Sequence, residues 1–406
     1  MFYQYYKLTN GVRIVFRQTT SDVLYSGVYI GVGSRDEQGS EEGMAHFIEH
    51  SIFKGTEHRR SYHILNRIDG VGGELNAFTT KEETCIYATS LSEHLERCLE
   101  LFADILFHSA FPEKELQKEK DVVLEEINSY KDSPADQIYD DFEEYILQGH
   151  PLAHNILGTP KNVRRFTPDA IRDFMRRNYT TDRMVITVVG NVKFDKLVRL
   201  CEKYFQQYPL APSTLVRNNP PEYRHFETHL NRRTHQVHML LGCKAPHCYD
   251  EKKVPFTLLN NILGGPAMNS RLNVAIREKY GFCYTIESQY VPFTDAGLFY
   301  IYAGVDADAW ERATQLVLEE LDKCCQSSLH PRQLKAAQQQ LIGQMTINND
   351  SGLNEMQSIG KACLNYDHVD TLEEMNRDIL SVTTEDILSV SQELFKRENV
   401  SILYYK

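Results

Sequence analysis

The sequence contains no CxxC pair and no long apolar run, and it has fewer basic than acidic residues. Its nine cysteines are odd in number and scattered, which favours reduced thiols over a disulfide framework. Lys and Arg total 44 against 56 Asp and Glu, and the formal net charge is −12. A nucleic-acid surface needs clustered cations, so we expect no nucleic-acid partner. Reduced thiols favour an intracellular protein, and we expect a cytoplasmic location.

The opening stretch, MFYQYYKLTNGVRIVF, lacks the basic region and the uninterrupted apolar core of a secretory signal. No apolar run approaches the roughly 18 residues that a membrane span needs, so we expect no membrane partner. What the chain does contain is typical of globular proteins: 406 residues, of which 42% are hydrophobic and 25% charged. That length is sufficient for two or more domains with full cores.

The order of the expected elements divides the chain into two halves. Residues 1–207 begin with alternating strands, continue with helices that are long and amphipathic from about 92 to 147, and end with a strand and a helix. Residues 208–223 contain four prolines and predict an interdomain linker. The order recurs in residues 224–406. We therefore predict the α+β class, with two homologous units that each pack helices on an antiparallel-rich sheet.

The second half provides an internal comparison for one helix. An offset of 210 aligns EGMAHFIEHSIFKG with KKVPFTLLNNILGG, and a later segment aligns FPEKELQKEKDVVLEEI with SLHPRQLKAAQQQLIGQM. Five ionisable residues of the first copy are thereby aligned with uncharged residues: His46 with Phe256, Glu49 with Leu259, His50 with Asn260, Glu119 with Ala337, and Glu126 with Gln344. A helix at this place can therefore pack without His or Glu, which indicates that these groups serve another purpose.

The motif HFIEH places His46 and His50 on one helical face, with Glu49 on the adjoining strip. Two imidazoles at this spacing can bind zinc, and HxxEH is the inverzincin signature. A simpler interpretation is a solvated helix face with an incidental histidine pair. The apolar residues around the motif argue against it, because unpaired ionisable groups there would carry a desolvation penalty of several kcal/mol.

At this point the chain resembles the pitrilysin or insulinase metallopeptidases, especially bacterial peptidases similar to the β subunit of mitochondrial processing peptidase. The resemblance includes GVYIGVGSRDE before the motif, HSIFKGT after it, GGELNAFTTKEET, and SRLNVAIREKYGFCYTIES in the second half. It implies a zinc-dependent endopeptidase with one zinc ion per chain. The implied ligands are His46, His50 and Glu126, the last of which follows His50 by 76 positions.

The resemblance also implies roles for other residues. Glu49 would act as the general base, and Glu119 would orient a ligand histidine. Tyr284 and zinc would stabilise the oxyanion, and Arg277 would position the peptide or Tyr284. Glu125 lies about 100° around the helix from Glu126, so only one of the two can face the site. Without the resemblance, REKYG predicts an ordinary charged helix end followed by a strand. The segment LGGPAMNSR resembles the family's glycine-rich loop.

The segment GELNAF is predicted to be an edge strand. Such a strand could bind an extended peptide through backbone hydrogen bonds, and Asn76 and Ala77 match the positions beside which the family binds substrate. The alternative is a strand with no role beyond the sheet. Backbone recognition would select unfolded peptides or short polypeptides of varied sequence as partners.

Family members form a clam-shaped chamber from four such units, whereas this chain supplies two, or half. The resemblance therefore implies a homodimer, or a heterodimer with an inactive paralogue. The presence of both HxxEH and the Arg277/Tyr284 pair favours the homodimer. In longer relatives the zinc lies in the first unit and the Arg/Tyr segment in the fourth, so the pair would serve the partner's zinc site. Two alternatives from other classes are a noncatalytic scaffold subunit and a zinc hydrolase of non-peptide substrates.

Overall fold

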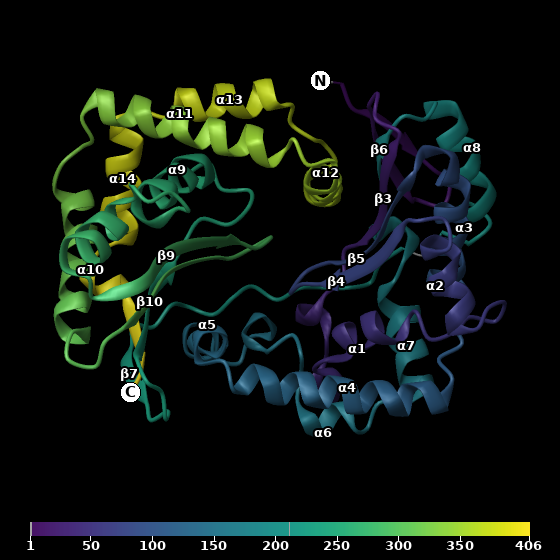
Figure 1. Cartoon of the computed structure of the whole chain (residues 1–406), viewed down its shortest axis with the longest axis horizontal. Coiled ribbons are helices and arrows are strands. Elements are labelled where there is room, and N and C mark those ends of the chain that lie inside the picture. The colour runs from purple at the N-terminus through teal and green to yellow at the C-terminus, as the bar shows by residue number, and fades with distance from the viewer. Residues whose placement is uncertain (1, 211) are drawn as a thin grey trace. The chain divides into compact units, whose positions relative to one another are not determined.

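The computed structural model describes residues 2–210 and 212–406 (Figure 1). Its internal contacts divide the chain into two compact units. Unit 1 comprises Met1–Asn128, His154–Arg217 and Ile347–Thr371, and unit 2 comprises Ser129–Ala153, Asn218–Thr346 and Leu372–Lys406. Each unit contains one sheet with packed helices, which confirms the predicted α+β class.

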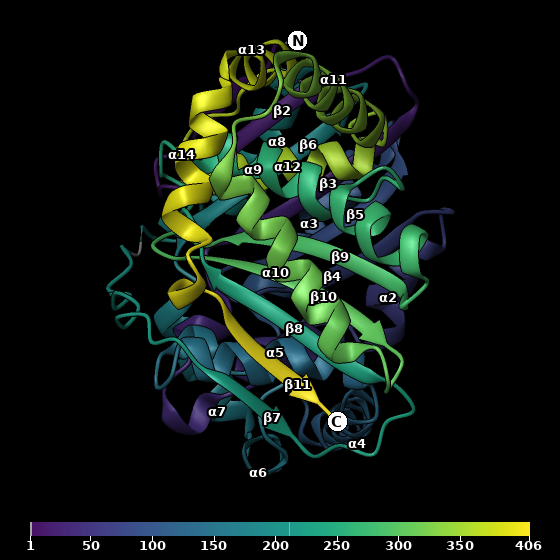
Figure 2. The same cartoon turned by 90° about the vertical axis from the view of Figure 1, so that its left-hand side faces the viewer.

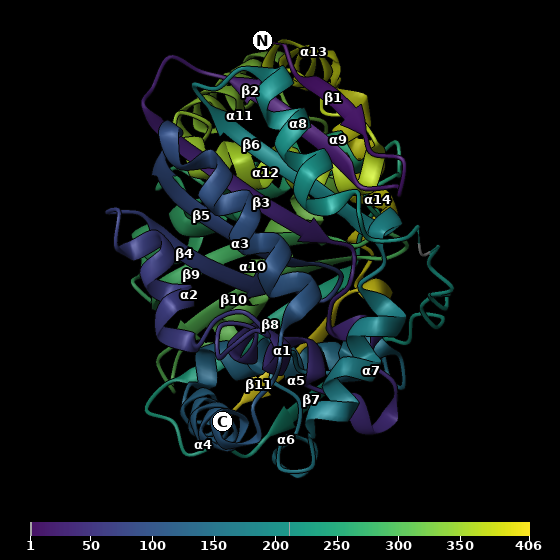
Figure 3. The same cartoon turned by 90° about the vertical axis from the view of Figure 1, so that its right-hand side faces the viewer.

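Unit 1 is built on a six-stranded sheet in the order β1-β2-β6-β3-β5-β4 (Figure 3). Its strands are β1 (Gln4–Lys7), β2 (Arg13–Gln18), β3 (Val23–Ile30), β4 (Glu74–Thr79), β5 (Thr84–Leu91) and β6 (Met184–Gly190). Its helices are α1 (Met44–Ser51), α2 (Ser61–Asp69), α3 (Leu95–His108), most of α4 (Glu113–Lys131), α6 (Pro160–Val163), α7 (Pro168–Asn178), α8 (Phe194–Phe205) and α12 (Gly352–Tyr366). β6 is buried along its whole length, because both faces of the sheet are covered there, and its sequence MVITVVG is accordingly apolar throughout.

Unit 2 is built on a five-stranded sheet in the order β7-β11-β8-β10-β9 (Figure 2). Its strands are β7 (Glu227–Leu230), β8 (Val237–Lys244), β9 (Cys283–Pro292), β10 (Gly297–Val305) and β11 (Ser401–Tyr405). Its helices are α5 (Pro134–Ile146), α9 (Lys253–Gly264), the π-helix η6 (Asn273–Glu278), α10 (Trp310–Gln326), most of α11 (Pro331–Asn348), α13 (Leu372–Ser381) and α14 (Thr384–Leu394). Short 3-10 turns complete the two units: η1 (Ser34–Asp36), η2 (Gly39–Glu41), η3 (Ser92–His94), η4 (Pro151–Ala153), η5 (Thr181–Arg183) and η7 (Arg397–Asn399).

The two sheets have the same topology. Strand by strand, the order β2-β6-β3-β5-β4 of unit 1 corresponds to β7-β11-β8-β10-β9 of unit 2. The pair β2 and β6 is parallel, as is its counterpart β7 and β11, and the remaining neighbours are antiparallel in both sheets. β1 is an addition to the edge of the first sheet. The weak sequence repeat therefore corresponds to a duplicated fold.

Within residues 2–210 and 212–406, no helix is both long enough and apolar enough to cross a membrane.

Each sheet is covered on one face by a helix that comes from the other half of the sequence. α12 comes from the second half but packs on β3 and β6, where Met356 and Ile359 join a core around Tyr29. α5 comes from the first half but packs on β8 and β11, and its Phe142 also meets the ring of Tyr300 in the neighbouring strand β10. Each sheet has two apolar faces, and helices from the same half of the sequence bury the second face. These helices are α3 and α8 for the first sheet, and α9 and α10 for the second. The compact units therefore differ from the contiguous segments 1–207 and 224–406 by this exchange.

The stretch 208–223 contains no helix or strand among its described residues, but its first part, up to Arg217, belongs to unit 1. The guanidinium of Arg217 donates two hydrogen bonds of 2.9 Å to the two carboxylate oxygens of Asp36, and a third of 3.1 Å to Glu82. The Asp36 side chain is fully buried, so this charge needs such a partner. The linker predicted between the units thus also contributes to the packing of the first.

We expect Gly360→Ala to destabilise the protein by about 1–3 kcal/mol, because the exchanged helix α12 approaches its sheet too closely for a side chain. A Cβ atom at Gly360 would lie 2.4 Å from Cε2 of Tyr29, whose ring is buried. Gly343→Ala in α11 is the matched control: its Cβ would meet no atom within 4 Å, and alanine should stabilise that helix by up to about 1 kcal/mol. Urea denaturation of both variants tests this, and a Gly360→Ala protein as stable as wild type would contradict it.

Candidate metal centre

The helix that carries HFIEH is anchored at its N-terminus by a buried carboxylate. Glu37 accepts hydrogen bonds of 2.8 Å from the backbone N–H groups of Gly43 and Ala45. Gly43 itself adopts φ 92°, and a Cβ there would lie 2.7 Å from the carbonyl oxygen of Leu157. These contacts fix where α1 begins and hence the direction in which its side chains point.

α1 packs against unit 1 through apolar residues. Phe47 and Ile48 are buried, and the ring of Phe47 lies 5.3 Å from that of Phe166. His46 lies on the same short helix and is only 7% exposed, so its imidazole is removed from bulk water. The desolvation penalty expected from the sequence for ionisable groups on this helix therefore applies to His46.

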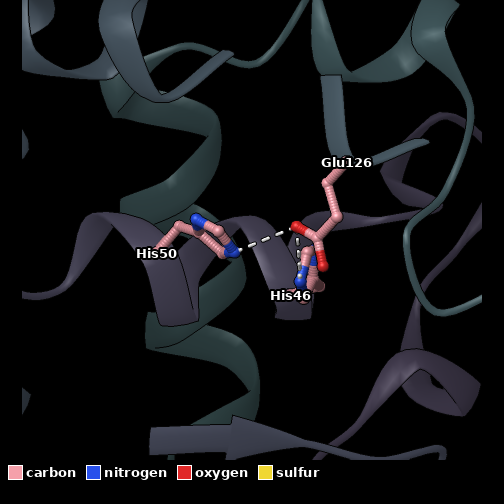
Figure 4. A group of neighbouring side chains, drawn as sticks. All are labelled: His46, His50 and Glu126. Carbon is pink, nitrogen blue, oxygen red and sulfur yellow. Dashed lines mark ion pairs between the residues drawn. The ribbon is translucent and has the colours of Figure 1, made fainter. Parts of the chain in front are cut away.

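His46, His50 and Glu126 meet at one point (Figure 4). The imidazole rings lie one helical turn apart on α1, with centroids 4.6 Å apart, and Glu126 reaches them from α4. Glu126 Oε2 lies 3.6 Å from His46 Nε2 and 3.3 Å from His50 Nε2. The neighbouring Glu125 is exposed to solvent, which agrees with the expectation that only one of the two glutamates faces the histidines.

This donor set fits a zinc ion. Atoms that bind one tetrahedral zinc at about 2.0–2.2 Å lie about 3.3–3.6 Å from one another, and the separations of Glu126 Oε2 from the two Nε2 atoms fall in that range. Two imidazoles and a carboxylate also match the ligand types of catalytic zinc sites, in which a fourth position stays open. His46, His50 and Glu126 are therefore the residues of this chain that would hold the ion.

The electrostatics of the two histidines differ. Burial, with a smaller contribution from His50, lowers the pKa of His46 to about 4, so that its ring is neutral at pH 7. Neutral imidazole is the form that binds a metal. The contact with Glu119 and the charges of Glu126 and Glu49 raise the pKa of His50 against the effect of burial.

Glu119 lies on the far side of His50. Its Oε2 is 3.5 Å from His50 Nδ1, and its Oε1 is 2.8 Å from Lys54 Nζ. Burial would raise the pKa of Glu119, but the contacts with His50 and Lys54 outweigh it and hold that pKa below the usual value. A carboxylate on Nδ1 leaves the Nε2 lone pair directed toward Glu126, an arrangement that orients metal-binding histidines.

Glu49 lies beside this group, on the strip of α1 that adjoins β4. Burial raises the pKa of its carboxyl, and the charge of Glu126 adds to that effect, whereas His50 opposes it. β4 forms the edge of the six-stranded sheet, as predicted for GELNAF. On it Asn76 is exposed, Ala77 is half-buried, and the Asn76 side chain accepts a hydrogen bond of 2.9 Å from the Ala77 N–H.

Arg277 and Tyr284 meet in unit 2. Arg277 belongs to the π-helix η6, and its guanidinium carbon lies 5.6 Å from the ring centroid of Tyr284 in β9. Both line a pocket of about 290 Å³, together with Gly265 of the segment LGGPAMNSR. The Tyr284 side chain is 83% exposed and can contact another molecule. The expected ordinary helix end is a π-helix, a rare form that is frequent at functional sites.

The second copy shows how the same helix packs without ionisable residues. In α9, Phe256 and Leu259 are buried, and Asn260 Oδ1 accepts a hydrogen bond of 2.8 Å from the Ser288 hydroxyl in β9. Ala337, aligned with Glu119, is buried in α11. The packing requirements of this position are thus met by apolar groups and one neutral hydrogen bond.

Two further residues of the site were not predicted from the sequence. Glu37 anchors α1, and Lys54 holds Glu119. An acidic residue shortly before a helix is a common signal for its N-terminus, but nothing in the sequence indicates that Glu37 is buried. Lys54 follows the motif in HSIFKGT, and its partner lies 65 positions later, so only the fold brings the two together.

Similar proteins carry names of zinc proteases, which agrees with a donor set that fits zinc. The model of the insulinase family, peptidase family M16, matches residues 13–160, and that of the peptidase M16 inactive domain matches residues 165–341. The chain is 35% identical to the uncharacterized zinc protease YmxG of Bacillus subtilis, over 97% of this chain and 96% of that protein. It is 33% identical to an uncharacterized zinc protease of Mycobacterium leprae, over 98% of this chain and 90% of that protein.

Solved structures share the fold. A crystal structure of a peptidase M16 inactive domain from Pseudomonas fluorescens superposes with a TM-score of 0.93 at 20% identity, and covers 100% of this chain and 98% of that one. A protease from Helicobacter pylori superposes with a TM-score of 0.92 at 22% identity, and covers 100% and 99%. The name of the second matched domain is in line with Phe256, Leu259 and Asn260, the uncharged residues of α9 at the positions aligned with the HxxEH motif.

Proposed function

The chain belongs to the insulinase family of peptidases, and we propose that it is a zinc-dependent endopeptidase of the HxxEH (inverzincin) type. One observation carries the proposal: the Nε2 atoms of His46 and His50 converge on one oxygen of Glu126 at the spacing of zinc ligands. We propose one catalytic zinc per chain at this point. When bound there, zinc lowers the pKa of water toward about 7 and polarises a peptide carbonyl.

Glu49 is the proposed general base. It lies next to His50 on α1, and burial raises its pKa above the usual value, which makes its carboxylate a stronger base. Glu49 accepts a proton from the attacking water and donates it to the leaving amine. Glu119 does not take part in proton transfer and orients His50 through Nδ1.

The edge strand β4 supports peptides as substrates. Its outward backbone groups can pair with an extended chain, so that an unfolded peptide adds to the sheet beside α1, with Asn76 and Ala77 as its neighbours. Because the backbone is the same for every sequence, we propose broad selectivity for unfolded peptides or short polypeptides.

We propose a homodimer as the active assembly. Each chain supplies two units of the repeated fold, and two chains would supply the four units of a complete chamber. Tyr284 would donate a hydrogen bond to the oxyanion, and Arg277 would position Tyr284 or the peptide. In this assembly the Arg277/Tyr284 pair of one chain serves the zinc site of the other.

Metal removal tests the function. Chelation is expected to abolish cleavage of a quenched fluorescent peptide of unfolded sequence, and added Zn²⁺, but not Mg²⁺, should restore it. Activity that persists in the fully metal-free protein would overturn the proposal. A zinc-loaded protein that cleaves no member of a varied peptide set would favour the noncatalytic scaffold instead.

Glu126→Gln, which introduces the residue found in the second copy, is expected to weaken zinc binding at least about tenfold, because a neutral amide loses the charge attraction for the cation. Glu125→Gln removes the same charge one position earlier, from an exposed side chain, and should leave zinc affinity nearly unchanged. Competition with a zinc-sensitive dye measures both. Equal affinity and stoichiometry in Glu126→Gln and wild type would remove Glu126 from the site.

A further inference from the structure

A second pair of histidines in unit 1 has nearly the same geometry as the first. His58 follows α1 in the loop that leads to α2, and His108 ends α3. Their ring centroids lie 4.7 Å apart with an interplanar angle of 73°, against 4.6 Å and 66° for His46 and His50. Glu57 completes the group, and one ligand atom from each of Glu57, His58 and His108 lies within 4.8 Å of the others.

Each of the two histidines has one ring nitrogen in contact with a neighbouring side chain. His58 Nδ1 lies 2.6 Å from Oδ1 of the buried Asp104. His108 Nε2 lies 2.7 Å from the Tyr208 hydroxyl, and the Tyr208 ring stacks on Phe107 at a centroid distance of 3.6 Å. In metal sites such partners fix the tautomer and direct the other nitrogen to the ion. Here these contacts leave His58 Nε2 and His108 Nδ1 available to bind a metal ion through their lone pairs.

The carboxylate of Glu57 stands where a third ligand is needed. Its Oε2 is 3.6 Å from His108 Nδ1, the nitrogen that Tyr208 leaves available. Metal binding selects the tautomer in which His108 Nε2–H donates to Tyr208. The Glu57 side chain is 70% exposed, so the group is open to ions from solution and has room for water ligands.

The backbone holds these residues in place without a metal. The N–H of Glu57 donates a hydrogen bond of 2.8 Å to the carbonyl oxygen of His108, and that of Ala110 donates one of 3.0 Å to Gly55. Asp104 also accepts hydrogen bonds from Thr56 and Arg59, at 2.9 and 2.6 Å. The loop is therefore fixed to the end of α3, and little ordering remains for a ligand to impose.

We propose that Glu57, His58 and His108 form a second metal site, separate from the candidate catalytic centre, which takes Zn²⁺ or a similar borderline-soft divalent ion. Two imidazoles and one carboxylate suit Zn²⁺, Ni²⁺ or Cu²⁺ and discriminate against Mg²⁺ and Ca²⁺, which prefer oxygen ligands. The site is exposed and lies beside Arg59, so it binds zinc more weakly than the His46, His50 and Glu126 site and exchanges it more readily. Bound metal ties the loop after α1 to α3.

Zinc titration of the full chain with a competing indicator dye tests the site. The wild-type protein is expected to bind two zinc ions per chain, one tightly and one weakly. The double variant His58→Ala/His108→Ala should keep only the tight ion, and His46→Ala/His50→Ala only the weak one. Glu57→Gln alters an exposed side chain that the fold does not need, and should weaken the second ion at least about tenfold. His63→Ala replaces an exposed histidine of α2 outside the group and should change neither ion.

Each outcome separates this proposal from the proposed peptidase. Wild type that binds one ion, lost in His46→Ala/His50→Ala, would overturn the second site and leave the peptidase proposal intact. Two ions retained in His58→Ala/His108→Ala, or unchanged affinity in Glu57→Gln, would also overturn it. One ion lost only from the His58/His108 variant would support this site and refute the catalytic zinc. Excess Mg²⁺ that displaces the weak ion would contradict the assigned ligand chemistry.

Discussion

Glu49→Gln is expected to bind zinc as wild type does and to lose peptide hydrolysis by about 100- to 10,000-fold, the usual contribution of a general base. Glutamine has nearly the same size and leaves His46, His50 and Glu126 in place, but its amide cannot accept a proton from water. Zinc content measured beside turnover of a quenched peptide distinguishes this result from the loss of a ligand, because Glu126→Gln should lower both.

The pH dependence of activity provides a second measurement on the same residue. Burial raises the pKa of Glu49, and the ionised carboxylate is the active form of a general base. Wild-type kcat/KM should therefore rise with pH through that raised pKa, and the residual activity of Glu49→Gln should lack this limb. Full turnover in Glu49→Gln with normal zinc content would exclude Glu49 as the base.

Local features of the sequence predicted the elements that carry the site. The strand-like alternation in LYSGVYIGVG predicts β3 at Val23–Ile30, and the helical spacing of HFIEH predicts α1 at Met44–Ser51. In both cases the periodicity of apolar residues over a few positions decides the structure, and no distant contact is required. The duplicated topology follows from the same local patterns in the same order.

The origin of the helices that cover each sheet could not be predicted in this way. An amphipathic pattern shows that α5 and α12 have an apolar face but contains nothing about which sheet buries it. The two helices have exchanged sheets, and the alternative, in which each covers the sheet of its own half, would have the same sequence pattern. Only close packing between particular residues distinguishes the two arrangements, such as the contact of Gly360 with the ring of Tyr29.

The residues of the candidate site also differ in whether local sequence could place them. Spacing along one helix placed His46, Glu49 and His50 together, whereas the position of Glu126 came from a family resemblance, since 76 residues separate it from His50. The role of Glu37 could not be predicted although Gly43 and Ala45 follow it closely, because nothing in the sequence indicates that its carboxylate is buried. The second histidine pair could not be predicted because its members are distant in sequence and no motif links them. The structure brings His58 and His108 within reach although 50 positions separate them.

The assembly leads to the second large expected effect. If two chains complete one chamber, the Tyr284 that serves a zinc site comes from the partner chain. Glu49→Gln and Tyr284→Phe alter residues of different units, 1 and 2, so each variant would carry one defect that the other chain can complement. The Tyr284 side chain is 83% exposed, so its loss of a hydroxyl should leave folding unaffected while it removes an oxyanion donor.

Subunit exchange between these two nearly inactive variants is expected to restore activity to about a quarter of the wild-type level. Random mixing at equal amounts yields about half heterodimers, and each heterodimer contains one composite site with intact Glu49 and Tyr284 and one with both replaced. Mixing Glu49→Gln with the double variant Glu49→Gln/Tyr284→Phe is the matched control, since no pairing of these chains contains an intact Glu49. Exchange is followed independently with chains that carry two different fluorophores.

Recovery only in the first mixture supports a site shared between chains, because activity then depends on the pairing of two separate defects. No recovery despite measured exchange would mean that Glu49 and Tyr284 act within one chain, and the dimeric active site would be wrong. A Tyr284→Phe protein that is fully active alone would instead show that Tyr284 takes no part.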